Sequence, residues 1–289
     1  MKPKISVLMS VYKEPIEWLK TTIESILNQT ISDFEYIIIV DNPENNEAID
    51  VIKNYAESDD RIKMYVNEQN MGLVKSLNRG LQYCTGEYVA RMDADDIAHT
   101  DRFEKQLKYI EETGYDMIGS DFNVFHDDVI ERTGKGAYTP EVCNKILKYE
   151  SCVLHPSWFV RKDVYDKLGG YRDIDSCEDL DFLIRASLGG FKIGNAPYVL
   201  IEYRNNPKSI CHLKTFKQKA TTSLMTKRMR EGKVMDMEEY HAYLESDECK
   251  KYIKKAERVA KFENYYYDTK SSALVKYGSV CILLIRFAN

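Results

Sequence analysis

The first half of the chain alternates short, continuously apolar runs with amphipathic helical patterns. Apolar residues recur at helical spacing in the segments between these runs. Strands that are apolar at nearly every position are buried on both faces, so the pattern predicts an α/β fold with a mostly parallel central sheet flanked by helices. The predicted strands are Ile5–Val11, Tyr36–Val40, Ile62–Val66 and Tyr88–Met92.

A polar residue follows each of these predicted strands. Tyr12, Asp41 and Asp93 come directly after their strands, and Asn70 follows the third after a short loop. The carboxyl ends of parallel strands meet at one edge of a sheet, where ligands bind. We therefore expect a binding site at this edge of a Rossmann-like half.

The second half has a looser pattern. We predict strands over 117–125, 157–160 and 191–203, helices over 141–148 and from Glu178, a turn at Gly169-Gly170, and charged helices over 214–264. The simplest division is a catalytic domain over 1–211, with halves 1–115 and 116–211, and a helical C-terminal extension over 212–289.

Charge and cysteine content exclude several classes of protein. Residues 204–289 hold 18 Lys and Arg against 10 Asp and Glu, whereas the whole chain has a net charge of −5. An acidic body with a basic tail argues against nucleic acid as the main partner. The seven cysteines form no C-x-x-C pair, so neither a disulfide framework nor a zinc site is predicted, and we expect a cytoplasmic protein. No secretory signal is predicted, and the apolar run Val280–Ile285 is too short to span a bilayer.

An acidic cluster, Asp93-Ala94-Asp95-Asp96, follows the fourth predicted strand. Neighbouring carboxylates repel one another unless a cation lies among them, and manganese and magnesium ions bind through carboxylates, diphosphate oxygens and water. The cluster is thus a candidate divalent-metal site. The alternative is a solvated acidic turn that caps the next helix.

Several motifs in order give the chain a resemblance to a known family. It resembles the family 2 glycosyltransferases of the GT-A fold over about residues 4–211. The matching segments are Val7–Glu14, Asp41, Asn70–Gly72, Asn78–Gly80, Gly86–Asp96, His155–Ser157, Gly169–Tyr171, Glu178-Asp179 and Tyr203-Arg204.

The resemblance implies roles for the residues at the predicted sheet edge. Asp95 would ligate the metal ion, Asp93 would contact the ribose, and Asp41 would accept a hydrogen bond from the base. Asp96 would instead cap a helix beginning near Ala98. The remaining residues implied to bind the nucleotide are Ser10, Tyr12, Glu14, Asn70 and Gly72.

Two of these assignments have structural alternatives. Asp41 is alternatively a strand-end carboxylate that caps the next turn, and Asn70–Gly72 a plain strand-to-helix turn. Arg79 is expected to pair with the acidic cluster or a phosphate, or else to form a surface salt bridge.

The second predicted centre is Glu178-Asp179, at the start of a helix. Attack by an acceptor hydroxyl on a sugar's anomeric carbon needs a carboxylate to take the proton. The family is inverting and uses the second residue of this pair, so the resemblance implies Asp179 as base and Glu178 as its support. A helix N-terminus is expected to keep Asp179 ionised and weakly basic. The alternative is a pair of first-turn acids favoured by the helix dipole.

Three other segments have open assignments. His155 is expected either beside the site or as a buried loop histidine, and Trp158 in the core. Arg204 and Lys208 either grip phosphate or belong to a solvated charged run. The tail over 265–289 mixes Tyr, Lys and aliphatic residues, which suits a helix at a membrane interface; packing against 214–264 or a homodimer contact are the alternatives.

The resemblance implies an inverting, metal-dependent glycosyltransferase of cell-surface polysaccharide biosynthesis. It would transfer a sugar from a nucleotide-sugar donor, by family habit a UDP-sugar, to a glycan or lipid-linked acceptor on the cytoplasmic face of the membrane. One alternative is a sugar-1-phosphate nucleotidyltransferase, which the glycine-free loop Ser10–Pro15 argues against. The other is a non-catalytic nucleotide-sugar-binding protein, which the retained Asp95 and Glu178-Asp179 argue against.

Overall fold

A parallel sheet forms the first half of the molecule. The computed structural model describes residues 2–127, 129–206 and 215–268. Strands β1 (Ile5–Val11), β2 (Phe34–Val40), β3 (Ile62–Val66) and β4 (Tyr88–Asp93) lie in the order β3-β2-β1-β4, all parallel. The strand positions predicted from the apolar runs are confirmed.

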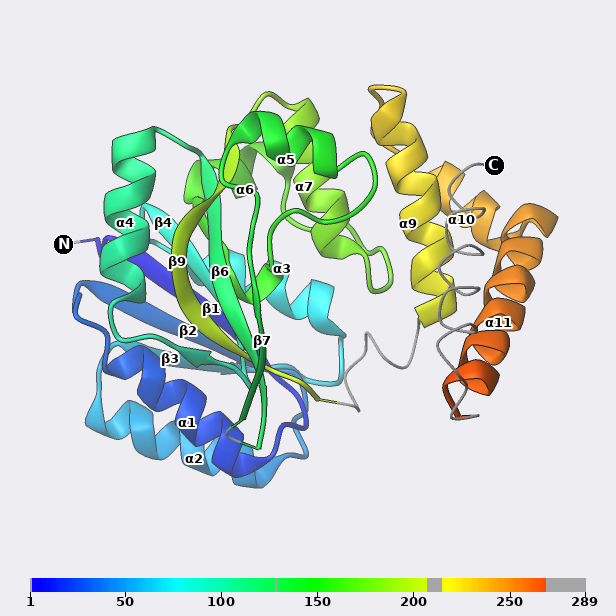
Figure 1. Ribbon diagram of the computed structural model, residues 1–289. Helices are drawn as coiled ribbons and strands as arrows, with labels where there is room; N and C mark the ends of the chain where they lie inside the picture. Colours follow the sequence, from blue (N-terminus) through cyan, green and yellow to red (C-terminus); the bar gives the residue numbers. More distant parts are fainter. Residues whose placement is uncertain (1, 128, 207–214, 269–289) are drawn as a thin grey trace.

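Helices cover both faces of this sheet (Figure 1). Helices α1 (Ile16–Leu27), α2 (Asn46–Ser58) and α4 (Arg102–Thr113) bury their apolar residues in one core layer. Helix α3 (Leu73–Tyr83) packs in the other layer, together with α7 (Glu178–Leu188). The two layers explain why β1 and β2 are apolar throughout: alternate side chains enter opposite cores.

Beyond β4 the sheet becomes mixed, which the strand pattern does not reveal. The order continues β4-β8-β6-β9-β5, with β8 antiparallel to both β4 and β6. Strands β6 and β9 pair in parallel, and β5 and β7 add antiparallel edges. The bounds are β5 (Ile97–Ala98), β6 (Met117–His126), β7 (Val129–Gly134), β8 (Phe159–Arg161) and β9 (Ile193–Arg204). Strand β7 was not predicted because it is exposed and has no apolar alternation.

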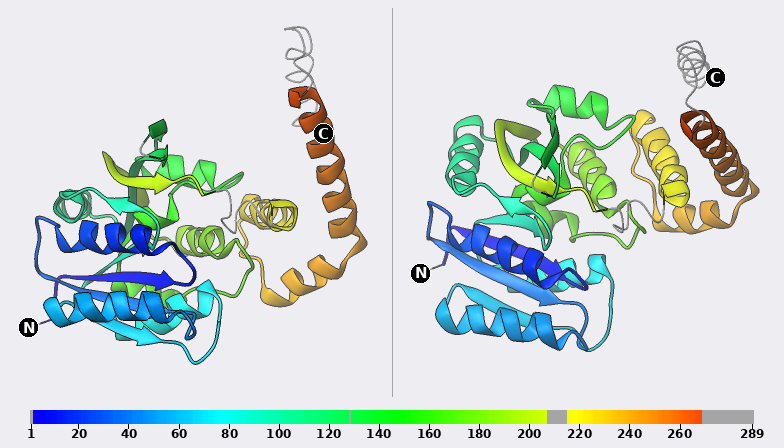
Figure 2. Two further views of the ribbon diagram at one scale, coloured as in Figure 1. Left: turned by 90° about the horizontal axis from the view of Figure 1, so that it is seen from below. Right: turned by 60° about the horizontal axis from the view of Figure 1, so that its bottom comes forward.

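Shorter helices complete the catalytic body, and three more form the extension. The body adds α5 (Pro140–Ile146), the 3-10 turn His155–Ser157 and α6 (Lys162–Leu168). This turn shortens the strand expected over 157–160, which begins at Phe159. The extension comprises α9 (Thr215–Arg230), α10 (Met237–Glu245) and α11 (Asp247–Asp268), as predicted, and lies to one side of the body (Figure 2).

Three expectations fall outside the described residues. The domain boundary at 211 and the two alternatives for Lys208 lie within 207–214, and most of the tail with its expected membrane contact lies within 269–289, so all three stay predictions. Among the residues that the structure does describe, no helix is both long and apolar enough to cross a bilayer.

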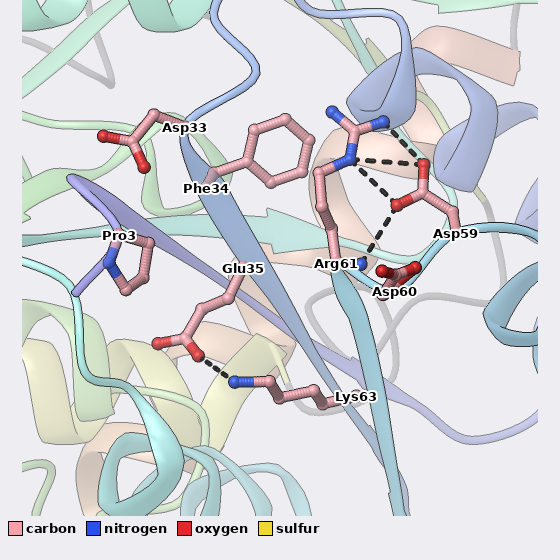
Figure 3. A pocket seen from close by; sticks show the side chains of 8 residues that line it. All are labelled: Pro3, Asp33, Phe34, Glu35, Asp59, Asp60, Arg61 and Lys63. Carbon is pink, nitrogen blue, oxygen red and sulfur yellow. Dashed lines mark hydrogen bonds and ion pairs between the residues drawn. The ribbon is translucent and has the colours of Figure 1, made fainter. Parts of the chain in front are cut away.

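A hollow of about 430 Å³ lies at the amino ends of the parallel strands (Figure 3). Both cations of its lining are already paired, Arg61 with Asp59 and Lys63 with Glu35. Because these charges are already matched and the hollow faces away from the carboxyl ends, we do not assign it to the predicted chemistry.

Candidate active site

The carboxyl ends of β1, β2 and β4 bring the predicted nucleotide-site residues together. Ser10 lies opposite Asp93 in the register of β1 and β4. The N–H of Asp41 donates to the carbonyl of Val11 at 2.7 Å, so β2 ends beside β1. The edge predicted from sequence is therefore formed.

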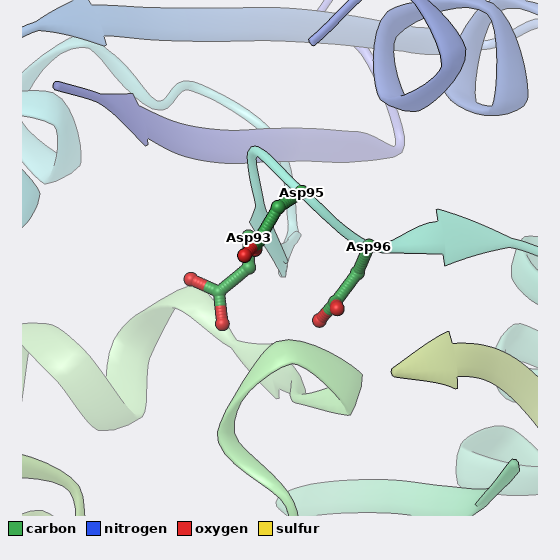
Figure 4. Close-up of side chains that lie close together, drawn as sticks. All are labelled: Asp93, Asp95 and Asp96. Carbon is green, nitrogen blue, oxygen red and sulfur yellow. The ribbon is translucent and has the colours of Figure 1, made fainter. Parts of the chain in front are cut away.

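Asp93, Asp95 and Asp96 form the acidic cluster (Figure 4). One carboxylate oxygen from each lies within 4.8 Å of the others. Burial, together with the charges of Asp93 and Glu14, raises the pKa of Asp95 to about 7. Burial also raises the pKa of Asp96 well above its ordinary value. Crowded carboxylates with raised pKa values are the arrangement that a divalent cation relieves.

Glu14 is a fourth carboxylate near this cluster. Its Oε2 accepts from the N–H of Tyr12 at 2.7 Å, which folds the β1–α1 loop back on itself. Burial raises the pKa of Glu14, and the charge of Asp93 adds to the rise. The ring of Tyr12 is 37% exposed, so it is available to a ligand at this edge.

Asp96 does not cap a helix, contrary to the expectation. It is fully buried, helix α4 begins only at Arg102, and Ile97 starts a short strand instead. The Oδ1 of Asp96 accepts from the N–H of Arg204 at 2.8 Å, whereas Oδ2 has no partner among the described residues.

The Arg204 guanidinium is held by the protein. Its Nε donates to the carbonyl of Asp95 at 2.8 Å, and the group lies over the rings of Trp18 and Phe125, at 4.5 and 4.4 Å from their centroids. Arg204 thus fixes the loop that carries the acidic cluster. These contacts argue against both expected roles: the Arg204 side chain is neither a solvated charge nor a guanidinium free to grip phosphate.

Asp41 organises the loop before α3. Its carboxylate accepts from the N–H groups of Met71 and Gly72, both at 2.8 Å, and from Asn67 Nδ2 at 2.7 Å. Gly72 has a φ of +84°, a conformation that favours glycine. Asp41 therefore holds a loop about 30 residues further along the chain, and not the next turn as in the alternative; contact with a base stays a prediction.

Arg79 lies away from the acidic cluster, so the expected pairing is not formed among the described residues. Its Nη1 donates to the carbonyl of Val66 at 2.9 Å and to Oδ1 of Asn67. Because Asn67 also bonds Asp41, Arg79 helps to hold the loop that precedes α3. Asn67 was missed from sequence, although it directly follows a predicted strand.

The second centre lies on the first turn of α7. Burial, together with the charge of Asp179, raises the pKa of Glu178 to about 8. Burial also raises the pKa of Asp179, although the N–H of Leu180, 2.7 Å from its Oδ1, works in the opposite direction. The expectation that the helix N-terminus leaves Asp179 weakly basic is wrong, because desolvation outweighs the helix end.

His155 is a buried loop histidine. Its Nε2 lies 2.9 Å from the hydroxyl of Tyr171, and its ring packs edge-on against Trp158. Burial lowers the pKa of His155 well below its ordinary value, so the ring is neutral. Trp158 is fully buried, as predicted.

Arg91 is the principal residue that sequence reasoning missed. It is 2% exposed, and its Nη2 pairs with Asp93. The signal was present, because Arg91 interrupts the apolar run of β4 two positions before Asp93 and so shares its side of the strand.

The comparisons with known proteins address the family. Residues 6–169 match the family model described as glycosyl transferase family 2. The chain belongs to this family.

Curated relatives in the family agree. The chain is 37% identical to an uncharacterized glycosyltransferase of Methanocaldococcus jannaschii, covering 70% of this chain and 71% of the relative. It is 33% identical to the O-antigen biosynthesis glycosyltransferase WbnJ of Escherichia coli, covering 71% and 81%. It is also 33% identical to the Escherichia coli UDP-Gal:alpha-D-GlcNAc-diphosphoundecaprenol beta-1,3-galactosyltransferase, covering 70% and 74%.

The fold is that of a solved glycosyltransferase. The mannosyltransferase PcManGT of Pyrobaculum calidifontis, solved with GDP-Man and Mn²⁺, matches with a TM-score of 0.61 at 16% identity, covering 98% of this chain and 81% of that one. The family 2 chain therefore has the expected GT-A fold, with a mixed sheet and a helical C-terminal region.

Proposed function

We propose that this family 2 glycosyltransferase is a metal-dependent, inverting enzyme of cell-surface polysaccharide biosynthesis, which transfers a sugar from a UDP-sugar to a hydroxyl of a glycan or lipid-linked acceptor. The names of the two Escherichia coli relatives support the polysaccharide role, the UDP donor and the lipid-linked acceptor. The single observation that carries the mechanism is the electrostatic proximity of two acidic centres, because the charge of Asp93 raises the pKa of both Glu178 and Asp179.

The residues of the acidic cluster fit a divalent cation. Asp95 is the proposed ligand, and beside it lies the Oδ2 of buried Asp96, which has no partner in the described part of the chain. A bound manganese or magnesium ion would neutralise charge on the departing diphosphate. Around it, Asp93 is proposed to contact the ribose, while Ser10, Tyr12 and Glu14 line the nucleotide pocket.

The loop Asn70–Gly72, which precedes α3, completes the proposed donor pocket. Asp41 holds the N–H groups of Met71 and Gly72 in place, which presets the turn that Asn70 begins. A pocket fixed before binding loses less conformational entropy when the nucleotide arrives.

Asp179 is the proposed general base. The acceptor oxygen attacks the anomeric carbon as the bond from that carbon to the diphosphate oxygen breaks, and the hydroxyl proton passes to the Asp179 carboxylate. The raised pKa of Asp179 makes its carboxylate a stronger base than an exposed aspartate. Glu178 lies beside it, and the charge of Asp179 helps to raise the pKa of Glu178.

A panel of nucleotide sugars with manganese tests this proposal, scored for slow donor hydrolysis and for metal-dependent binding. Asp179→Asn is expected to lower transfer by at least about 100-fold while leaving donor binding near wild type. Asp95→Ala should weaken both, and Asp50→Asn, a change at an exposed residue of α2, is the control. Full transfer by Asp179→Asn would remove the base assignment.

A further inference from the structure

Arg91 is a buried cation with an incomplete set of partners. Its Nη2 pairs with Asp93, whereas its Nε and Nη1 have no partner among the described residues. Burying a cation and leaving N–H groups unbonded costs folding free energy, and an apolar side chain here would lengthen the apolar run of β4 at lower cost. An arginine at this position therefore destabilises the fold, so folding alone does not account for it.

The other buried arginine of this region shows what a purely structural role looks like. The guanidinium of Arg102 donates from Nε to Gln106 at 2.9 Å and from Nη2 to the carbonyl of Arg91, also at 2.9 Å, and Nη1 lies 3.3 Å from the sulfur of Met92. All three of its nitrogens are engaged, in contrast to Arg91.

The strand register directs Arg91 toward α7. Arg91 lies opposite Leu8 of β1, and Leu8 belongs to the core layer that contains Leu180 of α7. Ala90 and Met92 belong to the opposite layer. Arg91 therefore lies between the end of β4 and the first turn of α7, where Glu178 and Asp179 begin the helix.

We propose that Arg91 is a positioning residue shared by the two acidic centres: it fixes the carboxylate of Asp93 at the donor site, and its charge offsets the carboxylates of Glu178 and Asp179. This inference rests on the proposed function. It identifies a buried cation whose charge acts on both groups of carboxylates.

The surroundings of the pair support this role. The charge of Arg91 lowers the pKa of Glu178 and Asp179, and it also lowers the pKa of Asp95 and Asp96. Against this, the negative charge of Asp93 raises the pKa of both Glu178 and Asp179, and the charge of Asp179 raises the pKa of Glu178. The neighbouring Tyr171 and Cys177 are kept neutral, because burial raises the pKa of each.

Arg91→Met tests the charge, Arg91→Lys tests the fork geometry, and Arg185→Met is the matched control. Arg185 is also a buried arginine, on α7 itself, but it serves Asp181 and the carbonyls of Leu168 and Gly170. Two readouts are used: the acid limb of the pH profile for hydrolysis of a UDP-sugar that the wild type turns over, and a carbon-13 carboxyl titration of metal-free protein with the Glu178 signal assigned through Glu178→Gln.

We expect Arg91→Met to move both the acid limb and the Glu178 midpoint upward by about one pH unit. Arg91→Lys should leave the limb near wild type while weakening UDP binding several-fold, and Arg185→Met should leave the limb unchanged. A folded Arg91→Met with wild-type midpoints, or an equal shift in Arg185→Met, would overturn the inference.

Two further arms keep the test decisive. If Arg91→Met does not fold by circular dichroism, Arg91→Gln gives the neutral comparison; if neither folds, a folded Arg91→Lys with wild-type UDP affinity overturns the positioning of Asp93. A wild type without hydrolysis or transfer would count against the proposed function alone, because the carboxyl titration needs no turnover.

Discussion

Replacing Asp95 by asparagine is expected to stabilise the metal-free protein while removing metal-dependent nucleotide binding. The pKa of Asp95 rises from 3.8 to about 7, because it is buried and lies near the charges of Asp93 and Glu14. Below pH 3.8 the carboxyl is protonated in both folded and unfolded chains and costs nothing. As pH rises toward 7 the unfolded chain loses this proton first, so ionised Asp95 destabilises the fold fully only above pH 7.

The magnitude follows from the size of this shift. A rise of about three pKa units corresponds to an upper bound of about 4 kcal/mol. Asp95 is only partly buried, and salt screens its charge, so we expect about 1–2 kcal/mol in practice. For a chain of this size that is a rise in Tm of roughly 3–6 °C.

Thermal unfolding of wild type, Asp95→Asn and the control Asp50→Asn at pH 4 and pH 8 measures this effect, with EDTA or with manganese and UDP. In EDTA the variant should exceed the wild type at pH 8 and match it near pH 4. Manganese with UDP should raise the Tm of the wild type and of the control only. A variant that is less stable than the wild type at pH 8 in EDTA would refute the account of a site strained by its own charges.

Three other outcomes are expected. Transfer should rise about tenfold per pH unit up to about pH 8. The base Asp179 and its neighbour Glu178 both have raised pKa values, that of Glu178 being about 8, so the pair is fully ionised only above that pH. A flat rate profile between pH 6 and 8 would contradict this. Asp41→Asn should lower the free energy of unfolding in urea by about 2 kcal/mol, because an amide cannot accept from both loop N–H groups; an unchanged urea midpoint would count against that clamp. Arg204→Lys should weaken manganese-dependent UDP binding roughly tenfold by calorimetry, because lysine cannot reproduce the fork that holds the carbonyl of Asp95, and wild-type affinity would exclude this role.

The parallel half of the fold was predictable because its signal is local. Strands β1 and β2 are buried at almost every position, so their apolar runs stand out in the sequence. The mixed half has no such signal. Strand β5 has two residues, β8 has three, and β7 is exposed, so their pairing depends on partners far away in the chain.

The sequence predicted which residues lie at the carboxyl edge of the sheet, but not the hydrogen bonds that hold them there. Position after a strand identified Asp41 and Asp93, whereas the hydrogen bonds that define their roles come from other segments. Asp96 shows the difference most clearly. An aspartate before a helical pattern predicts an N-cap, yet its partner is the N–H of Arg204, more than 100 residues away. Burial, which decides the basicity of Asp179, is equally invisible in a local pattern.

These long-range contacts explain how the fold tolerates so many carboxylates at one edge. The loop carrying Asp95 is held by Arg204 from β9, and the loop carrying Gly72 is held by Asp41 from β2. Neither attachment uses a carboxylate oxygen proposed for the metal ion. The packing of the two apolar core layers and these loop contacts therefore offset the mutual repulsion of the carboxylates. Under the proposed function, a cation that enters the cluster would lower an electrostatic free energy that the folded chain already carries.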